Sequence, residues 1–118
     1  GGTFTVSHDL EQGYEDADIV YVKSWGSPKA YGEPRKEKKL RLPYRKSWIC
    51  NQSLMEKTRS DSIFMHCLPV RRNVVVTDDV IDGKHSVVYD QAENRLHTVK
   101  AVMYTIMRNP FQEDPTFY

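Results

Sequence analysis

Residues 64–73 bring together groups that could handle an anion, since a histidine, a cysteine, a Leu-Pro pair and two arginines occur there in close succession. Pro69 has no amide hydrogen and pushes Leu68 toward an extended conformation. The carbonyl groups of Cys67 and Leu68 are therefore candidates to accept hydrogen bonds from an amide-like NH2 group or an amine. The Leu-Pro bond is also a candidate for a cis peptide. The plainer interpretation is a strand that ends at a proline and carries a buried thiol.

His66 and Cys67 are not expected to form a nucleophilic pair. They are neighbours in an extended segment, so their side chains point to opposite faces. His66 remains a further candidate for ligand contact. The cysteines and histidines of the chain lack zinc-site spacing, and no glycine-rich nucleotide motif is present, so we expect neither a metal nor another cofactor.

Arg95 is the second candidate for anion chemistry. It follows Asp90, the predicted start of a helix, and Glu93 completes a capping box with that aspartate. A cation near a helix N-terminus is unfavourable unless an anion binds there too. A guanidinium can bind a phosphate or a polarised carbonyl oxygen in bidentate fashion. By position alone, an anion-binding role for Arg95 and an ordinary surface ion pair with Glu93 or Asp90 are equally well supported.

Lys23 and Trp25 follow a predicted buried strand. A lysine at a strand end could neutralise a substrate carboxylate, with Trp25 as a further candidate beside it. The alternative is a lysine that simply extends its ammonium group into solvent.

Two basic groups of residues need not bind anything. Arg71 and Arg72 could bind phosphate, but we favour ion pairs with Asp78 and Asp79. Residues 35–46 are rich in lysine and arginine, yet the chain carries 17 basic and 16 acidic residues for a net charge of +1. We therefore interpret this stretch as a solvated loop and expect no nucleic acid as partner.

The bulk composition fits one small domain or a piece of a larger protein. The chain has 118 residues and is 39% hydrophobic, with no apolar run close to the roughly 20 residues of a membrane span. Two cysteines do not make a disulfide framework. We expect a cytoplasmic protein without a membrane partner.

Hydrophobic patterning predicts alternating strands and helices. Strands are predicted at residues 3–6, 19–22, 63–67 and 86–89. Helices are predicted at residues 10–17, 51–58, 77–81 and from 90 to about 109, with a long loop at 26–48 and a tail at 111–118. The last helix has one apolar face, formed by Ala92, Leu96, Val99, Val102, Met103 and Ile106.

This order favours an α/β fold with an open parallel, Rossmann-like sheet. The strand at 19–22 has the continuous apolar character of a strand buried on both faces. Ligands of such sheets bind at the carboxyl ends of the strands. The segments that carry Lys23, Cys67 and Arg95 all follow predicted strands, so we expect them to converge on one edge.

Several motifs resemble those of one enzyme family. Residues 63–73 contain His-Cys-Leu-Pro followed by Val-Arg-Arg-Asn, and residues 88–103 contain Asp-Gln-Ala-Glu-Asn-Arg. Together with residues 77–80 they resemble the ornithine and acetylornithine carbamoyltransferases. Residues 17–26, which end in Val-Lys-Ser-Trp-Gly, resemble the N-acetylornithine or N-succinylornithine branch. The likeness extends to about residue 108.

The resemblance implies a function and roles for these residues. Family members move the carbamoyl group of carbamoyl phosphate to the amine of ornithine or an N-acylated ornithine, in arginine biosynthesis. By resemblance, Cys67 and Leu68 contact the carbamoyl group, and Leu68 also contacts the amine. Arg95 contacts carbamoyl phosphate, and Lys23 contacts the substrate carboxylate. Residues 1–110 would be the C-terminal portion of the second, ornithine-binding domain.

The resemblance also has limits. The family's Ser-x-Arg-Thr and His-Pro-x-Gln motifs are absent, so the chain is expected to lack the N-terminal domain and to be inactive alone. Complete members are trimers, which implies a homo-oligomer. Some acetylornithine enzymes carry a lysine where this chain has Val75. Two alternatives stay open: a carbamoyltransferase for another amine, and a non-catalytic remnant that binds small anions or a partner subunit.

Overall fold

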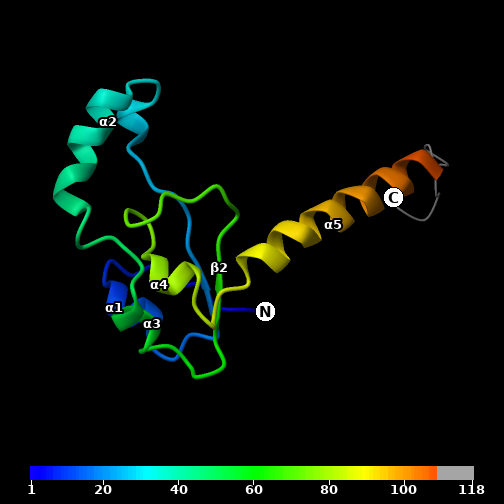
Figure 1. Ribbon diagram of the computed structural model, residues 1–118, viewed down its shortest axis with the longest axis horizontal. Helices are drawn as coiled ribbons and strands as arrows, with labels where there is room; N and C mark the ends of the chain where they lie inside the picture. The colour runs from blue at the N-terminus through cyan, green and yellow to red at the C-terminus, as the bar shows by residue number, and fades with distance from the viewer. Residues whose placement is uncertain (109–118) are drawn as a thin grey trace.

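The computed structural model describes residues 1–108, which form two short strands and several helices (Figure 1). The strands are β1 (Ile19–Tyr21) and β2 (Ile63–Met65). The α-helices are α1 (Leu10–Tyr14), α2 (Pro34–Arg41), α3 (Gln52–Met55), α4 (Asp78–Ile81) and α5 (Val88–Arg108). Two 3₁₀ turns flank α2, namely η1 (Pro28–Ala30) and η2 (Leu42–Tyr44).

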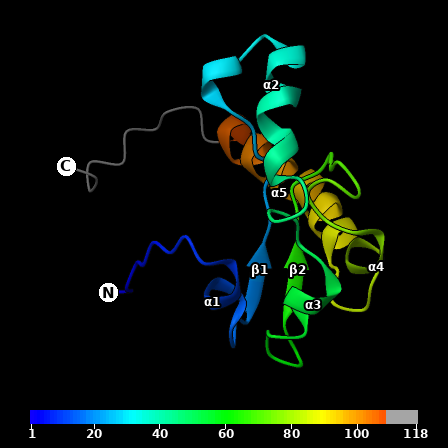
Figure 2. The same ribbon diagram turned by 90° about the vertical axis from the view of Figure 1, so that its left-hand side faces the viewer.

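The two strands lie side by side and are parallel (Figure 2). Val20 pairs with Phe64 in the register, so these two side chains occupy the same face. On the other edge of β2, the only ladder contact within the described chain is a parallel bridge between Phe64 and Ser86. The predicted strand at 86–89 is therefore wrong, because the chain makes this one bridge and enters α5 at Val88.

One face of the sheet carries the hydrophobic core. Phe64 has no exposed surface, and Val20 is 7% exposed. Helices α1, α3 and α4 and the start of α5 supply Tyr14, Met55, Val80, Ile81 and Val88. The core also contains Cys50 and Val76, which form a bridge outside the helices. Burial of these apolar side chains is the main force that holds such a small sheet together.

The other face of the sheet is largely uncovered. Ile19 is 58% exposed and Tyr21 is 52% exposed, although both belong to the strand that was predicted to be buried on both faces. That prediction is wrong because residues 1–108 place little chain over this side. A continuous apolar run cannot show by itself which of its faces will find a partner.

Side-chain caps begin two of the predicted helices. Asp9 accepts hydrogen bonds from the amides of Glu11 and Gln12 and so begins α1, as expected. Asn51 accepts from the amide of Leu54 and begins α3. Both helices are shorter than predicted.

The strand predicted at residues 3–6 is absent from the described structure. Phe4 is 90% exposed, and no strand lies beside this segment within residues 1–108. Alternating residues favour an extended conformation, but a strand needs a neighbour to supply hydrogen bonds. The alternation at residues 3–6 is typical of a strand, but within residues 1–108 the segment has no neighbouring strand to pair with.

The long loop predicted at 26–48 contains helix α2, which projects from the sheet (Figure 2). The prediction treated Pro28, Pro34 and Pro43 as breakers. Each of them instead stands in the first turn of a helical segment, where its missing amide costs no hydrogen bond. Ion pairs one turn apart, between Glu37 and Arg41 and between Glu33 and Lys36, add modest support.

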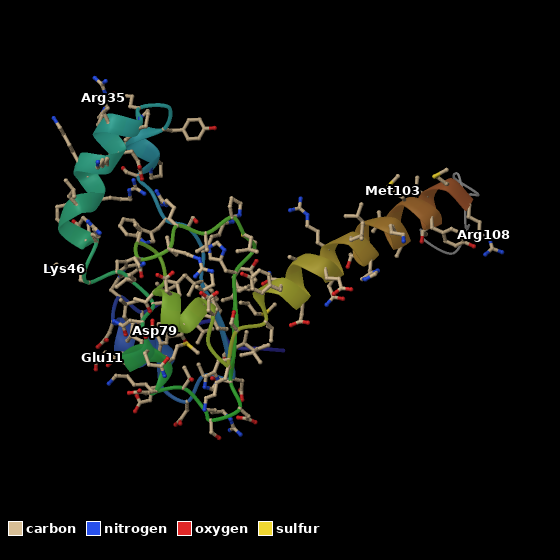
Figure 3. The ribbon with its side chains drawn as sticks, viewed as in Figure 1. Glu11, Arg35, Lys46, Asp79, Met103 and Arg108 are labelled. Atoms are coloured by element: carbon tan, nitrogen blue, oxygen red, sulfur yellow. The ribbon has the colours of Figure 1, made fainter. Side chains whose placement is uncertain are left out.

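Helix α5 extends away from the rest of the structure, as the positions of Met103 and Arg108 illustrate (Figure 3). It begins at Val88, so Asp90 lies inside its first turn rather than at the predicted cap. The predicted apolar face exists, but its residues are exposed. No helix within residues 1–108 is long and apolar enough to cross a membrane. The predicted end near residue 109 and the tail at 111–118 lie outside the described residues.

Candidate functional site

The turn that follows β2 presents open carbonyl groups. Leu68 has φ +43°, in the left-handed region, so the extended conformation predicted for it is wrong, and its bond to Pro69 is cis. Within residues 1–108, neither the Cys67 nor the Leu68 carbonyl accepts a hydrogen bond. Both groups are therefore available to a donor from outside the described chain, as the sequence predicted.

The His66 side chain forms a hydrogen bond within this turn. Its Nδ1 atom accepts a hydrogen bond from the Leu68 amide at 2.9 Å, so the neutral ring carries its proton on Nε2. The residue is 1% exposed, and burial lowers its pKa, which favours the neutral ring. His66 is buried and Cys67 is exposed, as expected for neighbours whose side chains point to opposite faces.

The two cysteines should differ sharply in reactivity. Cys67 is exposed, whereas Cys50 is buried, and burial raises the pKa of the Cys50 thiol. We expect a disulfide reagent to modify Cys67 at least about tenfold faster than Cys50 in the native protein. Absorbance of the released thiolate measures both rates. Cys67→Ser should remove the fast phase, and a fast phase that persists in this variant would contradict the assignment.

The ends of the two strands are held together by one arginine. Arg71 donates from Nη2 to the carbonyl oxygen of Trp25 at 2.7 Å, which ties the segment after β1 to the segment after β2. The predicted ion pair of Arg71 with an aspartate is therefore wrong. Lys23 is exposed and, with Trp25, lines a cleft of about 300 Å³ beside β1. Cys67, Leu68 and Arg95 do not line that cleft.

Gln91 joins the same region to α5, a role that the sequence analysis missed. Its Oε1 atom accepts from the backbone amide of His66 at 3.0 Å, and its Nε2 atom donates to the hydroxyl of Tyr21 at 3.2 Å. One side chain thus links β1, the turn after β2 and the first turn of α5. Its position within the Asp-Gln-Ala-Glu-Asn-Arg motif was the only available signal.

Arg95 is farther along α5 than the sequence suggested. Because the helix begins at Val88, Arg95 is its eighth residue and lies in the third turn, beyond the reach of the N-terminal dipole. Its side chain is exposed and has no ion pair within the described residues, while Glu93 pairs with His97. The alternative reading, in which Glu93 or Asp90 neutralises Arg95, is not what the structure shows.

Arg72 belongs to a structural ion pair network. It donates to Asp78 at 2.9 Å and to Asp82 at 2.8 Å, and Asn73 also donates to Asp78. The predicted pairing with Asp78 is confirmed, and Asp82 replaces Asp79 as the second partner. The Arg72 guanidinium thus connects the segment after β2 to α4 and to Asp82, which follows α4.

The Arg72 network should make stability depend on acid. Hydrogen bonds from Arg72 hold the pKa values of Asp78 and Asp82 below their ordinary range. Their contribution is therefore complete above the ordinary carboxyl pKa and is lost as the pH falls through the lowered values. We expect Arg72→Gln to lower the melting temperature at about pH 7 and to have little effect at about pH 2. Lys84→Gln serves as the control, and an equal loss at both pH values would contradict the assignment.

Within residues 1–108, no group of three or more histidine, cysteine, aspartate or glutamate side chains is placed to hold a metal ion.

Comparison with known proteins identifies the family. Residues 1–106 match the family model described as the Asp/Orn binding domain of aspartate/ornithine carbamoyltransferase. The chain belongs to this carbamoyltransferase family. It is 46% identical over 107 residues to ornithine carbamoyltransferase of Thermococcus kodakarensis, covering 91% of this chain and 33% of that protein. It is 45% identical over 103 residues to N-acetylornithine carbamoyltransferase of Xylella fastidiosa, covering 87% and 30%.

Solved carbamoyltransferase structures share the fold. An acetylornithine transcarbamylase complexed with acetylcitrulline superposes with a TM-score of 0.70 and 44% identity, covering 81% of this chain and 28% of that one. Ornithine carbamoyltransferase from Pyrococcus furiosus gives a TM-score of 0.70 and 43% identity, covering 81% and 29%. The predicted α/β, Rossmann-like fold is confirmed. The chain spans about a third of the length of the curated relatives that it matches.

Proposed function

We propose that this chain supplies the amino-acid side of the active site of an N-acylornithine carbamoyltransferase. The observation that carries the proposal is the turn after β2, where the Cys67 and Leu68 carbonyls accept no hydrogen bond within residues 1–108. The other domain, with the rest of the carbamoyl phosphate site, is inferred to belong to the two thirds of the relatives' length that this chain does not match.

The proposed chemistry is carbamoyl transfer by positioning and electrostatics. The Cys67 carbonyl accepts a hydrogen bond from the carbamoyl NH2 group, and the Leu68 carbonyl orients the attacking amine. The amine nitrogen forms a bond to the carbamoyl carbon, the bond from that carbon to the phosphate oxygen breaks, and phosphate leaves. The amine loses one proton, which the departing phosphate takes up. Arg95 stabilises the negative charge that develops on carbamoyl phosphate.

Lys23 has a separate role in substrate binding. It lies at the carboxyl end of β1, and no acidic side chain pairs with it within residues 1–108. We infer that its ammonium group neutralises the substrate carboxylate. Trp25 and His66 act indirectly, by holding the two strand-end segments and the Leu68 turn. Arg71 and Arg72 are occupied by structural contacts.

The preference for an N-acylated ornithine rests on the likeness of residues 17–26 to the acetylornithine branch. Overall identity does not decide it, because the ornithine and N-acetylornithine relatives are 46% and 45% identical to the chain. The complete protein is inferred to be a cytoplasmic homo-oligomer, a trimer as in the family, that serves arginine biosynthesis.

A chimera tests the proposal. This chain would replace the matching third of the X. fastidiosa N-acetylornithine carbamoyltransferase, and a second chimera would use the T. kodakarensis ornithine enzyme. We expect both chimeras to consume carbamoyl phosphate and to form N-acetylcitrulline from N-acetylornithine. Citrulline from ornithine alone would favour the other substrate class. A folded, assembled chimera that carbamoylates neither amine would overturn the proposal in favour of a non-catalytic remnant.

A further inference from the structure

A small pocket lies where the C-terminal end of α2 meets the segment after β1. Its volume is about 260 Å³. It is lined by Trp25, Lys38, Arg41, Leu42, Arg45 and Val74, of which three are cations and none is acidic. Arg35 and Lys46, labelled in Figure 3, mark the two ends of the surrounding basic segment and do not line the pocket.

Positive charge around this pocket is poorly compensated. Arg41 pairs with Glu37 at 2.9 Å, but Lys38 and Arg45 have no carboxylate partner in the part of the chain that the structure describes. Arg71 adds a fourth cation nearby, because it bonds the carbonyl of Trp25 rather than a carboxylate. The C-terminal dipole of α2 contributes only a partial negative charge, equivalent to about half an elementary charge. The surroundings therefore favour an anion with more than one charge.

Buried donors at the same place lack acceptors. The indole Nε1 atom of Trp25 and the Nε and Nη1 atoms of Arg41 are buried, and within residues 1–108 none of them has a hydrogen-bond partner. A buried donor without an acceptor is costly, and the cost is greater for a charged guanidinium. Native structures usually satisfy such groups, so an external acceptor is the natural explanation.

We propose that this pocket binds a dianionic phosphate group, either free or as a phosphate monoester. Three phosphate oxygens can satisfy arginine and indole donors at once, and guanidinium groups match phosphate geometry. Leu42, Val74 and the Trp25 ring supply an apolar wall that a small ester group can contact. Of the residues given a part in carbamoyl transfer, only Trp25 lines the pocket, and its part there is indirect, so this inference goes beyond that function and does not depend on it.

The Trp25 indole N–H reports directly on binding. The chain has two tryptophans, and Trp48→Phe assigns their two indole signals in a proton–nitrogen correlation spectrum. Inorganic phosphate and phenyl phosphate are titrated separately into the full chain at constant ionic strength, with chloride as the balancing anion. We expect a saturable downfield movement of the Trp25 signal as the N–H gains an acceptor. Tighter binding of phenyl phosphate identifies a monoester site, and tighter inorganic phosphate a site for the free ion.

Matched variants distinguish phosphate binding in the pocket from general attraction of phosphate to the basic segment. Lys38→Gln and Arg45→Gln should each weaken phosphate binding at least about threefold. Lys46→Gln and Arg35→Gln remove equal charge from the same segment and should leave the affinity nearly unchanged. The proposal is overturned if the Trp25 signal does not saturate, if Lys46→Gln weakens binding as much as Arg45→Gln, or if acetate binds as well as phosphate.

Discussion

Replacing Arg95 with alanine is expected to lower carbamoyl transfer by the chimeric enzyme about a hundredfold or more. The side chain is exposed on α5 and has no ion pair within residues 1–108, so its guanidinium is free to meet an incoming anion. Removal of a donor aimed at developing charge acts mainly on the chemical step. Steady-state rates of acetylcitrulline formation should therefore show a loss in kcat larger than any rise in KM for carbamoyl phosphate.

Two variants sharpen this test. Lys100→Ala removes another exposed cation from the same helix and should change kcat by less than about twofold, because Lys100 has no proposed contact with the reacting groups. Arg95→Lys keeps the charge but loses the bidentate geometry, and it should recover only part of the activity. The melting temperature should stay the same in all three variants. Unchanged kcat in Arg95→Ala would remove this residue from the mechanism.

The parts of the fold that were predicted correctly depend on local signals. The run at 19–22 and the run at 63–67 gave the two strands, since an apolar stretch of this length between turn residues has few other uses. The starts of α1 and α3 were predicted to within one residue. Asp9 and Asn51 cap these helices, and a capping side chain acts within three residues of its own position. Such interactions involve only residues close together in the sequence, so the sequence alone can predict them.

The errors arose where a segment's neighbours decide its structure. Residues 86–89 have a strand-like composition. In the structure, however, Val88 packs in the core as the first residue of α5. Residues 3–6 have a strand pattern and no neighbouring strand within the described chain. The loop prediction for 26–48 failed for a different reason, since three prolines were taken as breakers although proline is well suited to the first turn of a helix.

In the candidate site, too, local features were predictable and long-range contacts were not. The open carbonyls at Cys67 and Leu68 were predicted from the properties of proline, a local effect, although Leu68 is left-handed rather than extended as that argument expected. The contacts that hold the site together were not predictable, because Arg71 reaches Trp25 across 46 positions and Gln91 reaches His66 across 25. A polar side chain that bonds a distant backbone group leaves no periodic signal in the sequence.

The largest effect on stability is expected at Phe64. Its side chain has no exposed surface and lies in β2, beside Val20 in the neighbouring strand. Its backbone amide and carbonyl also bond His85 and Val87, so the residue stands between β1 and the chain that leads into α5. Truncation to alanine removes buried apolar area and leaves a cavity that this small core can fill only in part.

We therefore expect Phe64→Ala to lower the free energy of unfolding by about 3–5 kcal/mol. Urea unfolding followed by circular dichroism measures the change, which should lower the midpoint with little change in slope. Phe64→Leu keeps most of the volume and should cost less than about 1.5 kcal/mol, so it stays measurable even if the alanine variant does not fold. Phe4→Ala is the matched control, because Phe4 is 90% exposed, and its effect should stay within about 0.5 kcal/mol. Equal losses for Phe64→Ala and Phe4→Ala would mean that the core is not centred on β2.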